Sequence, residues 1–385
     1  MKPFVFNTAA SIQFGAGKIA ELGEMAGTRM GKRVMLVSDP GLVNLGMVDA
    51  AVEILEKADL EVVVYADVQA DPPEAIIHAA VEMAREHKVE GIIGLGGGSS
   101  LDVAKLVAVL ALGHETLARM YGVGNVKGPR LPLILVPTTS GTGSEVTMVS
   151  IVTTGKSEKM GVVSPVILPD MALLDPELTY GLPPHITAAT GIDAMVHAIE
   201  AYASASPNNN AMSRNLACEA LRLMGGAIER AVHDGGDKDA RADMMLGSMM
   251  AGQAFANSPV AAVHALAYPI GGHYKVPHGL SNALVLPHVL RFNAVTAPKP
   301  YAELAPHVFP EMEGMGTQEA ASAFAEGMQE LSKRCGLQQG LREMGIERDA
   351  LPMLARDAMN QTRLLVNNPR EVDLDAALGI YEAAF

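Results

Sequence analysis

The segment GIIGLGGGSSLDVAKLVAVLAL, residues 91–112, contains a complete strand–turn–helix unit. An apolar run that ends in glycine is typical of a buried strand, and the Leu/Val/Ala-rich segment after it is expected to be a helix. The glycines allow a phosphate to approach the backbone, and the free amides of the first helical turn favour its charge. We therefore predict a pyrophosphate-binding turn at Gly96-Gly97-Gly98-Ser99-Ser100. It is neither a GxGxxG nor a Walker turn, and a purely structural turn is the alternative.

The same alternation of strand and helix extends over the N-terminal part of the chain. We expect strands at 34–39 and 61–68, and helices at 43–58 and 73–87. Continuous apolar strands separated by helices are typical of a parallel sheet that is buried on both faces. The fold class expected for residues 1–180 is therefore an α/β dinucleotide-binding domain.

Strand signals almost vanish after Pro184, where long Ala/Leu/Met-rich segments have helical periodicity. Breaks are expected at PNNN (207–210), DGGD (234–237) and GGHYKVPHG (271–279). A chain of 385 residues exceeds the usual size of a single core, so two domains are expected. We predict an all-helical second domain over residues 181–385.

A second glycine- and hydroxyl-rich turn, PTTSGTGSE (137–145), directly follows the apolar strand LPLILV. Ligands of open parallel sheets bind at the carboxyl ends of the strands, so these hydroxyls are placed to bond phosphate or ribose. Asp39, at the end of an earlier strand, is placed to accept hydrogen bonds from an adenosine ribose, and its charge would repel a 2′-phosphate. This favours NAD over NADP. The alternatives are an ordinary hydrophilic loop and a helix-capping aspartate.

Four side chains in the C-terminal half are candidates for one metal site. Asp193 and His197 are four residues apart and share one face of a helix, and His264 and His278 follow about seventy residues later. One carboxylate and three imidazoles suit iron(II) or zinc, whereas calcium and magnesium prefer oxygen ligands. The alternative is that each histidine is an ordinary core or surface residue.

Composition limits the other possibilities. The net charge is −14 and no cluster of Lys or Arg could follow a phosphate backbone, which argues against nucleic acid as a partner. No window approaches a membrane span, and the first residues lack the apolar region of a signal peptide, so we expect a soluble cytoplasmic protein. Cys218 and Cys335 cannot form a disulfide framework and are expected to be buried free thiols.

With these motifs in place, the chain resembles the group III, iron-containing alcohol dehydrogenases. The resemblance covers nearly all of the sequence and rests on FGAG, GGGSSLDVAK, PTTSGTGSEVT, DPELT, TAATGIDAMVHAIEAY, PHGLSNALVLPHVLRFN and NNPR. It implies a dehydroquinate synthase-like fold, in which an N-terminal dinucleotide-binding α/β domain precedes a helical domain. It also implies NAD and a metal, with iron(II) favoured and zinc as the alternative.

The resemblance further implies roles for individual residues. The metal ligands of the family match Asp193, His197, His264 and His278. Phe255 and Val149 match positions that line the substrate pocket, and Asp71 stands where relatives often have Asn. The implied cofactor contacts are Asp39, Gly98, Ser99, Asp102, Thr138, Thr139, Thr147, Lys159 and Leu178. We add Gly97 of the first turn, Asp71 and Val149 to this set.

Two positions depart from the family pattern and concern the proton relay. Many members have a second histidine four residues after the third ligand, where this chain has Tyr268. His273 stands where an aromatic residue is common. Tyr268 and His273 are therefore the two candidates for a catalytic proton-transfer role.

The function implied by the resemblance is hydride transfer between NAD and a small or medium aliphatic primary alcohol or its aldehyde. No Arg or Lys cluster near the motifs suggests a phosphate or dicarboxylate substrate. The alternatives are a glycerol or polyol dehydrogenase, an NAD- and metal-dependent lyase of the dehydroquinate synthase type, and a non-catalytic nucleotide-binding or scaffold protein. We expect at least a homodimer.

Overall fold

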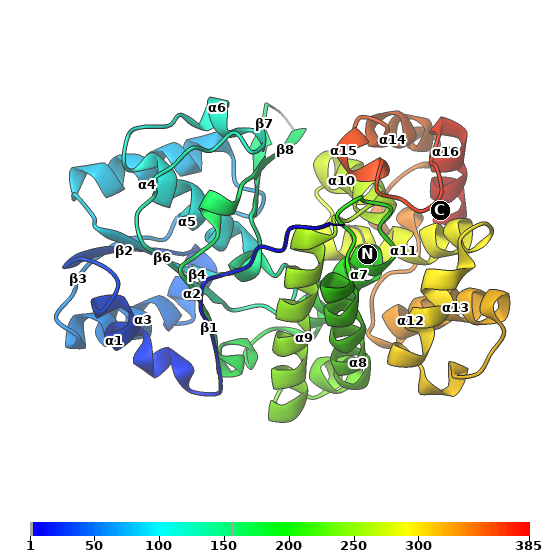
Figure 1. The fold of residues 1–385 in the computed structure, drawn as a ribbon, viewed down its shortest axis with the longest axis horizontal. Helices are drawn as coiled ribbons and strands as arrows, with labels where there is room; N and C mark the ends of the chain where they lie inside the picture. Colours follow the sequence, from blue (N-terminus) through cyan, green and yellow to red (C-terminus); the bar gives the residue numbers. More distant parts are fainter. Residues whose placement is uncertain (1–2, 156–157) are drawn as a thin grey trace. The chain divides into compact units, whose positions relative to one another are not determined.

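The computed structural model describes residues 3–155 and 158–385, and the chain divides into two compact units (Figure 1). An α/β unit comprises Asn7–Thr139 and Gly143–Thr179. A helical unit comprises Met1–Phe6, Ser140–Thr142 and Tyr180–Phe385. Among the described residues, no helix combines the length and the hydropathy that a membrane crossing requires.

Six parallel strands form the main sheet of the α/β unit, in the order β1-β9-β6-β4-β2-β3. In the centre of this sheet Leu36 lies opposite Ile93, which in turn lies opposite Ile134. The predicted parallel sheet is confirmed. Its strands are β1 (Ile12–Phe14), β2 (Arg33–Val37), β3 (Glu61–Tyr65), β4 (Gly91–Gly96), β6 (Leu133–Pro137) and β9 (Met171–Leu174).

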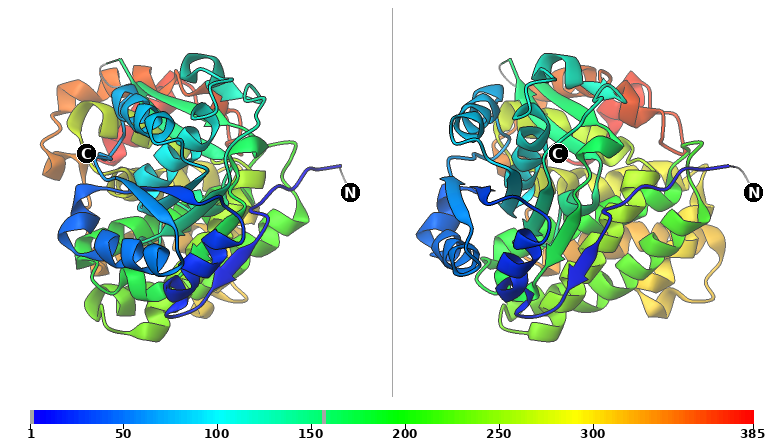
Figure 2. Two further views of the ribbon diagram at one scale, coloured as in Figure 1. Left: turned by 90° about the vertical axis from the view of Figure 1, so that its left-hand side faces the viewer. Right: turned by 60° about the vertical axis from the view of Figure 1, so that its left-hand side comes forward.

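Successive side chains of each strand point to opposite faces of the sheet, and both faces are buried. Met35 and Val37 belong to a core shared with α4 and α5, whereas Val34 and Leu36 belong to a core shared with α1 and α3. Helices thus cover both faces of the sheet (Figures 1 and 2). The helices of this unit are α1 (Leu22–Gly27), α2 (Pro40–Asn44), α3 (Met47–Lys57), α4 (Glu74–Glu86), α5 (Gly98–Leu110) and α6 (Leu117–Met120), with 3-10 turns η1 (Lys18–Glu21), η2 (Ser144–Val146), η3 (Pro165–Ile167) and η4 (Pro176–Thr179).

The α/β unit departs from the sequence prediction in two places. The single helix expected at 43–58 is wrong, because Gly46 adopts a φ of 72° in the left-handed region and separates α2 from α3. A second sheet was not predicted at all. In it β5 (Gly122–Val123) pairs in parallel with β8 (Glu158–Val163), and β8 pairs antiparallel with β7 (Val149–Thr154).

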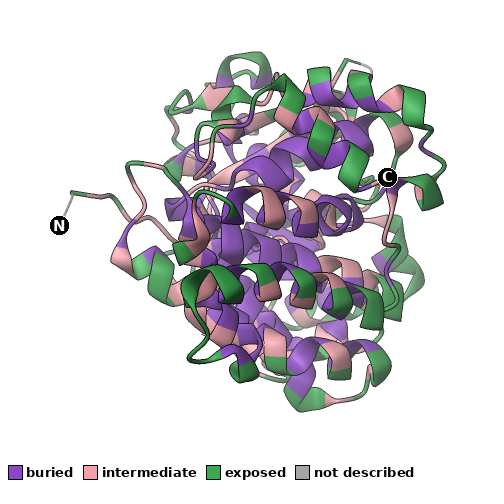
Figure 3. Cartoon of the chain, turned by 90° about the vertical axis from the view of Figure 1, so that its right-hand side faces the viewer, coloured by how far each residue is buried: buried purple, intermediate pink, exposed green. Residues whose placement is uncertain are grey.

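The described residues of the helical unit contain no strand, as predicted. Helix α7 is buried along most of its length at the centre of one large apolar core, and the outer helices expose their polar faces (Figure 3). The helices are α7 (Pro184–Ala203), α8 (Ala211–His233), α9 (Lys238–Asn257), α10 (Ala262–Tyr274), α11 (His278–Ala294), α12 (Pro298–Val308), α13 (Thr317–Arg334), α14 (Leu351–Ala358), α15 (Thr362–Leu365) and α16 (Leu374–Ala383), with 3-10 turns η5 (Pro310–Met312), η6 (Leu341–Met344) and η7 (Arg348–Ala350).

Side-chain caps and breaks delimit these helices. Asn210 caps α8 and Asp237 caps α9, each accepting a hydrogen bond from a backbone amide three residues later. The break expected at 271–279 is shorter than predicted, since α10 continues to Tyr274 and only three residues separate it from α11. Both cysteines are free thiols. Cys335 is buried as predicted, whereas Cys218 is only partly buried.

Candidate metal centre and cofactor-binding turns

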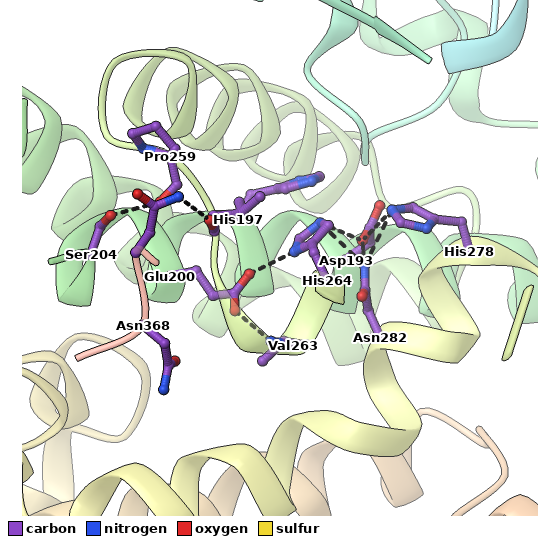
Figure 4. A network of polar contacts seen from close by, with 12 residues as sticks. Asp193, His197, Glu200, Ser204, Pro259, Val263, His264, His278, Asn282 and Asn368 are labelled. Carbon is purple, nitrogen blue, oxygen red and sulfur yellow. Dashed lines mark hydrogen bonds and ion pairs between the residues drawn. The ribbon is translucent and has the colours of Figure 1, made fainter. Parts of the chain in front are cut away.

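Two candidate ligands lie one turn apart in the middle of α7. Asp193 and His197 are both buried and share one face of the helix. Glu200 follows three residues after His197 and continues the same face (Figure 4). A helix that is apolar almost all round thus has one polar stripe, which faces α10 and α11.

The other two candidate ligands come from the next helices. His264 lies in the first turn of α10, and His278 is the first residue of α11. Asp193 Oδ1 lies 3.7 Å from His278 Nε2 and 4.0 Å from His264 Nε2. One ligand atom from each of Asp193, His197, His264 and His278 lies within 4.8 Å of the others. The structure therefore brings all four predicted ligands together.

In two of these histidines, a hydrogen bond from the ring nitrogen Nδ1 sets the orientation of the ring. His197 Nδ1 lies 3.3 Å from the carbonyl oxygen of Gly141, and His264 Nδ1 lies 2.6 Å from Glu200 Oε2. Each Nδ1–H therefore donates to an oxygen, which leaves the Nε2 lone pair available. The two rings are stacked, with centroids 4.8 Å apart.

Burial and mutual charge control protonation in the cluster. Burial lowers the pKa of His197 to about 3, so its imidazole is neutral near pH 7. Burial alone would raise the pKa of Asp193, but the three histidines and the Asn282 amide together hold it below its ordinary value. A divalent metal requires a deprotonated carboxylate and neutral imidazole ligands, as Asp193 and His197 provide.

Asn282 contacts three of the four candidate ligands. Its Nδ2 lies 2.5 Å from Asp193 Oδ1 and 3.3 Å from the Nε2 atoms of both His264 and His278. Its Oδ1 is buried and has no hydrogen-bond partner among the described residues. A buried amide oxygen without a partner is unfavourable unless an ion or water compensates it. The donor set of one carboxylate and three imidazoles fits iron(II) or zinc rather than calcium.

The predicted pocket and relay residues lie at different places around the cluster. The Phe255 ring stacks on His197 with centroids 4.3 Å apart. Tyr268 lies one turn after His264 on α10, and its ring centroid is 5.9 Å from that of His278. His273 is nine residues after His264, on the opposite side of the helix, and its Nε2 lies 2.6 Å from Asp357 Oδ2. Tyr268 is thus beside the cluster, and His273 is engaged with α14.

In the α/β unit, the first glycine turn meets Asp39. Gly97 is the N-cap of α5, and within residues 3–155 and 158–385 no side chain caps this helix. Asp39 is itself the N-cap of α2, where Oδ1 accepts hydrogen bonds from the Gly41 and Leu42 amides, and its Oδ2 accepts one from Ser100 Oγ at 3.3 Å. Asp39 is therefore a helix cap that also borders the glycine turn, so the two alternatives weighed from sequence are not exclusive.

The second turn lies beside the first because β6 and β4 are neighbours in the sheet. The amide of Thr138 donates to the Gly96 carbonyl oxygen, and a Cβ on Gly97 would lie 3.7 Å from Thr139 Cγ2. Leu178 is in η4 and packs against the core that contains α1 and α3. The carboxyl ends of β2, β4 and β6 thus carry Asp39, Gly97, Gly98, Ser99, Thr138 and Thr139.

Three other predicted cofactor residues, Asp102, Thr147 and Val149, contact the side chain of a lysine that sequence reasoning overlooked. Lys105 is fully buried, and its Nζ donates to Ser144 Oγ at 2.7 Å, Thr147 Oγ1 at 3.2 Å and the Val149 carbonyl oxygen at 2.8 Å. Asp102 accepts hydrogen bonds from Ser144 Oγ at 2.6 Å and from the Ile151 amide at 2.8 Å. Asp102 and Lys105 therefore fasten the start of β7 to α5.

The last pair of predicted residues forms an ion pair in the α/β unit. Lys159 Nζ contacts the Asp71 carboxylate, and the Asp71 carbonyl oxygen accepts a hydrogen bond from Thr153 Oγ1. Asp71 adopts a φ of 54°, in the left-handed region. The side chain of Lys159 is only 10% exposed, so its charge is balanced by Asp71 rather than by solvent.

Several residues that shape these sites were missed in the sequence analysis. For Glu200 and Asn282 a signal existed, because Glu200 lies seven residues after Asp193 and Asn282 lies four after His278, both helical repeats of a ligand position. The contact between His197 and Gly141 had no local signal, because 56 residues separate the two positions.

Comparisons with known proteins agree on one group. Residues 9–176 match the family model described as iron-containing alcohol dehydrogenase, and residues 187–385 match the C-terminal model of the same family. The chain is 42% identical over 360 residues to long-chain-alcohol dehydrogenase 1 of Geobacillus thermodenitrificans, covering 92% of this chain and 90% of the relative.

Solved structures give the same result. A 1,3-propanediol oxidoreductase superposes with a TM-score of 0.96 at 33% identity, and the match covers 100% of both chains. The sulfoacetaldehyde reductase from Bifidobacterium kashiwanohense, solved in complex with NAD+, superposes with a TM-score of 0.88 at 29% identity, covering 100% of this chain and 99% of the other.

Proposed function

Because the chain belongs to the iron-containing alcohol dehydrogenase family, a class of oxidoreductases, we propose that it transfers hydride between NAD and an aliphatic primary alcohol or its aldehyde. The observation that carries this proposal is the buried cluster of one carboxylate and three imidazoles, with ligand atoms within 4.8 Å of one another.

In the proposed site, Asp193, His197, His264 and His278 hold iron(II), with zinc as the alternative. The metal, when bound, polarises an alcohol or carbonyl oxygen as a Lewis acid. The chain's own contribution is to hold the His197 and His264 rings in orientations set by the Gly141 carbonyl oxygen and the Glu200 carboxylate. The Phe255 ring on His197 keeps an apolar surface next to the cluster, which suits a hydrocarbon substituent.

We propose that residues 1–180 bind NAD and that residues 181–385 bind metal and substrate. The support lies in the α/β unit, where Asp39, the uncapped N-terminus of α5 and the Thr138–Thr139 turn share one sheet edge. A helix N-terminus at such an edge suits a pyrophosphate, and the Asp39 carboxylate suits ribose hydroxyls. The relative solved with NAD+ supports the choice of this cofactor.

Tyr268 is the proposed proton-transfer residue. It lies on the same face of α10 as His264 and close to the His278 ring, whereas His273 contacts Asp357. A phenol can relay a proton only if it is within hydrogen-bond reach of the substrate oxygen or of a bridging water. Comparison of Tyr268→Phe with His273→Gln in the pH dependence of kcat tests this choice, and a profile changed only by His273→Gln would contradict it.

For the substrate we propose a small or medium chain length. The names of the relatives range from a long-chain alcohol dehydrogenase to a 1,3-propanediol oxidoreductase, so chain length is the first variable to test. The lyase alternative receives no support, because both halves of the chain match the alcohol dehydrogenase family.

The test is NAD reduction by chelated enzyme reloaded with iron(II), with zinc or with nothing. The substrates form a series of straight-chain alcohols and diols. Metal-dependent turnover that peaks at short or medium chain length is expected. Tight binding of NAD and metal without turnover of any alcohol would contradict the proposal.

We further propose that the protein is cytoplasmic and at least a homodimer. Both cysteines are free thiols, which suits a reducing compartment. Light scattering coupled to size-exclusion chromatography measures the mass directly, and a mass of 40.4 kDa would identify a monomer and contradict the proposed oligomer.

A further inference from the structure

Glu200 is a buried carboxylate with two defined partners in the helical unit. Only 5% of its surface is exposed. Its Oε1 accepts a hydrogen bond from the Val263 amide at 2.7 Å, and its Oε2 accepts one from His264 Nδ1 at 2.6 Å (Figure 4). Burial of a carboxylate costs free energy unless hydrogen bonds compensate it. The two hydrogen bonds supply this compensation, but packing alone does not explain why a charged group lies here.

The two bonds act on consecutive residues at the start of α10. The bond to Val263 holds the backbone, and the bond to His264 holds the ring of the following residue. Because a carboxylate can only accept, the His264 proton resides on Nδ1, and the Nε2 lone pair is directed to the side where Asp193 lies.

Helix α7 couples this contact to the other ligands. Glu200 lies two turns after Asp193 on the same face, so one rigid helix sets the distance between the carboxylate that holds His264 and the carboxylate that faces its Nε2. His197, between them, is held by a neutral backbone carbonyl. A charged acceptor increases the basicity of an imidazole ligand more than a neutral one does.

The other side of Glu200 faces a small cavity lined by Tyr301, Asn293 and Asn368 among others. The Tyr301 hydroxyl accepts a hydrogen bond from Asn293 Nδ2 at 2.8 Å, and Asn293 and Asn368 pair reciprocally. Burial raises the pKa of Tyr301, and the Glu200 charge adds to this effect, so the hydroxyl keeps its proton. Tyr301 therefore shares the cavity of Glu200 without touching His264, which makes it a matched control position.

We propose that Glu200 is a positioning residue of the metal centre, which fixes the Nδ1–H tautomer of His264 and thereby strengthens metal binding. This inference rests on the proposed function, because it requires the four-ligand cluster to hold a divalent metal. A merely structural role, in which Glu200 only anchors α10 through Val263, would change stability equally with and without metal.

Glu200→Gln separates these roles. The Gln carbonyl can still accept from Val263, but its amide can only donate toward His264 Nδ1. This donation forces the His264 proton onto Nε2, where the metal must bind. Glu200→Asp keeps a carboxylate with a shorter reach, so its metal affinity is expected to fall between those of Glu200→Gln and the wild type. Tyr301→Phe should leave metal affinity unchanged.

The experiment is chelator competition with cobalt(II) and zinc on the full chain, together with the cobalt(II) absorption spectrum and the metal-induced rise in Tm. About 10–100-fold weaker binding by Glu200→Gln, with a smaller rise in Tm, is expected. If that variant does not fold, the same ranking is read from Glu200→Asp against Tyr301→Phe.

The outcomes that contradict the inference are distinct. If the Glu200 variants bind metal with the same affinity as the wild type, the positioning role alone is overturned. Equal loss of affinity in Tyr301→Phe would also overturn it, because the effect would then belong to the cavity. Failure of the wild type to bind either metal would overturn the proposed function and this inference with it.

Discussion

Gly279 meets the backbone of α7 so closely that an added Cβ would collide with the carbonyl oxygen of Ala189 and lie 3.3 Å from Asp193 Cβ. Gly279 directly follows His278, so this approach of two helices sets where the fourth candidate ligand stands relative to Asp193. The absence of one side chain thus controls the geometry of the cluster.

Gly279→Ala is expected to separate α11 from α7 and to cost about 1–3 kcal/mol of stability, as is usual for overpacking. Metal affinity should fall as well, because His278 would move away from Asp193. Gly226→Ala is the matched control, since this exposed glycine on α8 has no atom within 4 Å of an added Cβ and should gain about 0.5–1 kcal/mol. Urea unfolding and metal titration of both variants test this, and unchanged metal binding in Gly279→Ala would refute the argument.

His264→Ala should reduce turnover to the metal-free background, because it removes a buried ligand and leaves Glu200 without its imidazole partner. NADH affinity should stay close to that of the wild type, since the proposed cofactor site belongs to the other unit. His185→Ala, at an exposed position of the same helix as His197, provides the control. Steady-state kinetics, metal content and NADH fluorescence decide the matter, and retained turnover would refute the metal role of His264.

Asp39→Asn tests the cofactor preference while keeping the helix cap. Asn preserves the N-cap of α2, whose hydrogen bonds go to the Asp39 side chain, but removes the charge that would repel a 2′-phosphate. The ratio of kcat/KM for NADP to that for NAD should rise by about tenfold, equivalent to about 1.4 kcal/mol. Asp373→Asn, at the N-cap of α16, should leave the ratio unchanged. An unaltered preference in Asp39→Asn would exclude a ribose contact.

Glu145→Gln should change how stability depends on pH. Burial raises the pKa of Glu145 from 4.5 to about 7, although the Lys105 charge opposes this. Between these values the unfolded chain releases the proton and the folded chain keeps it, so the contribution of Glu145 to stability is lost as pH rises from 4.5 to 7. The variant should lack this decline. Thermal unfolding in chelator from pH 4.5 to 8 measures it, with exposed Glu53→Gln as control. An identical profile in wild type and Glu145→Gln would contradict the assignment.

Much of the fold could be predicted from local sequence patterns. Apolar runs bounded by glycine predicted β2, β4 and β6, and helical periodicity predicted most helices of the second unit. The hairpin of β7 and β8 was not predicted, because its strands are only half-buried and lack a continuous apolar run. The helix break at Gly46 was not predicted either, because an isolated glycine within a helical pattern does not determine whether the helix continues.

The sequence by itself determined which chemical groups the protein has and how they repeat along each helix and strand. It placed Asp193 and His197 on one helical face and the glycine turns at strand ends, because backbone geometry depends on nearby residues. Only the tertiary structure decided which oxygens the His197 and His264 imidazoles face and that Lys105 holds the turn at Thr147. Such contacts join residues more than forty positions apart, and their formation depends on how whole helices pack.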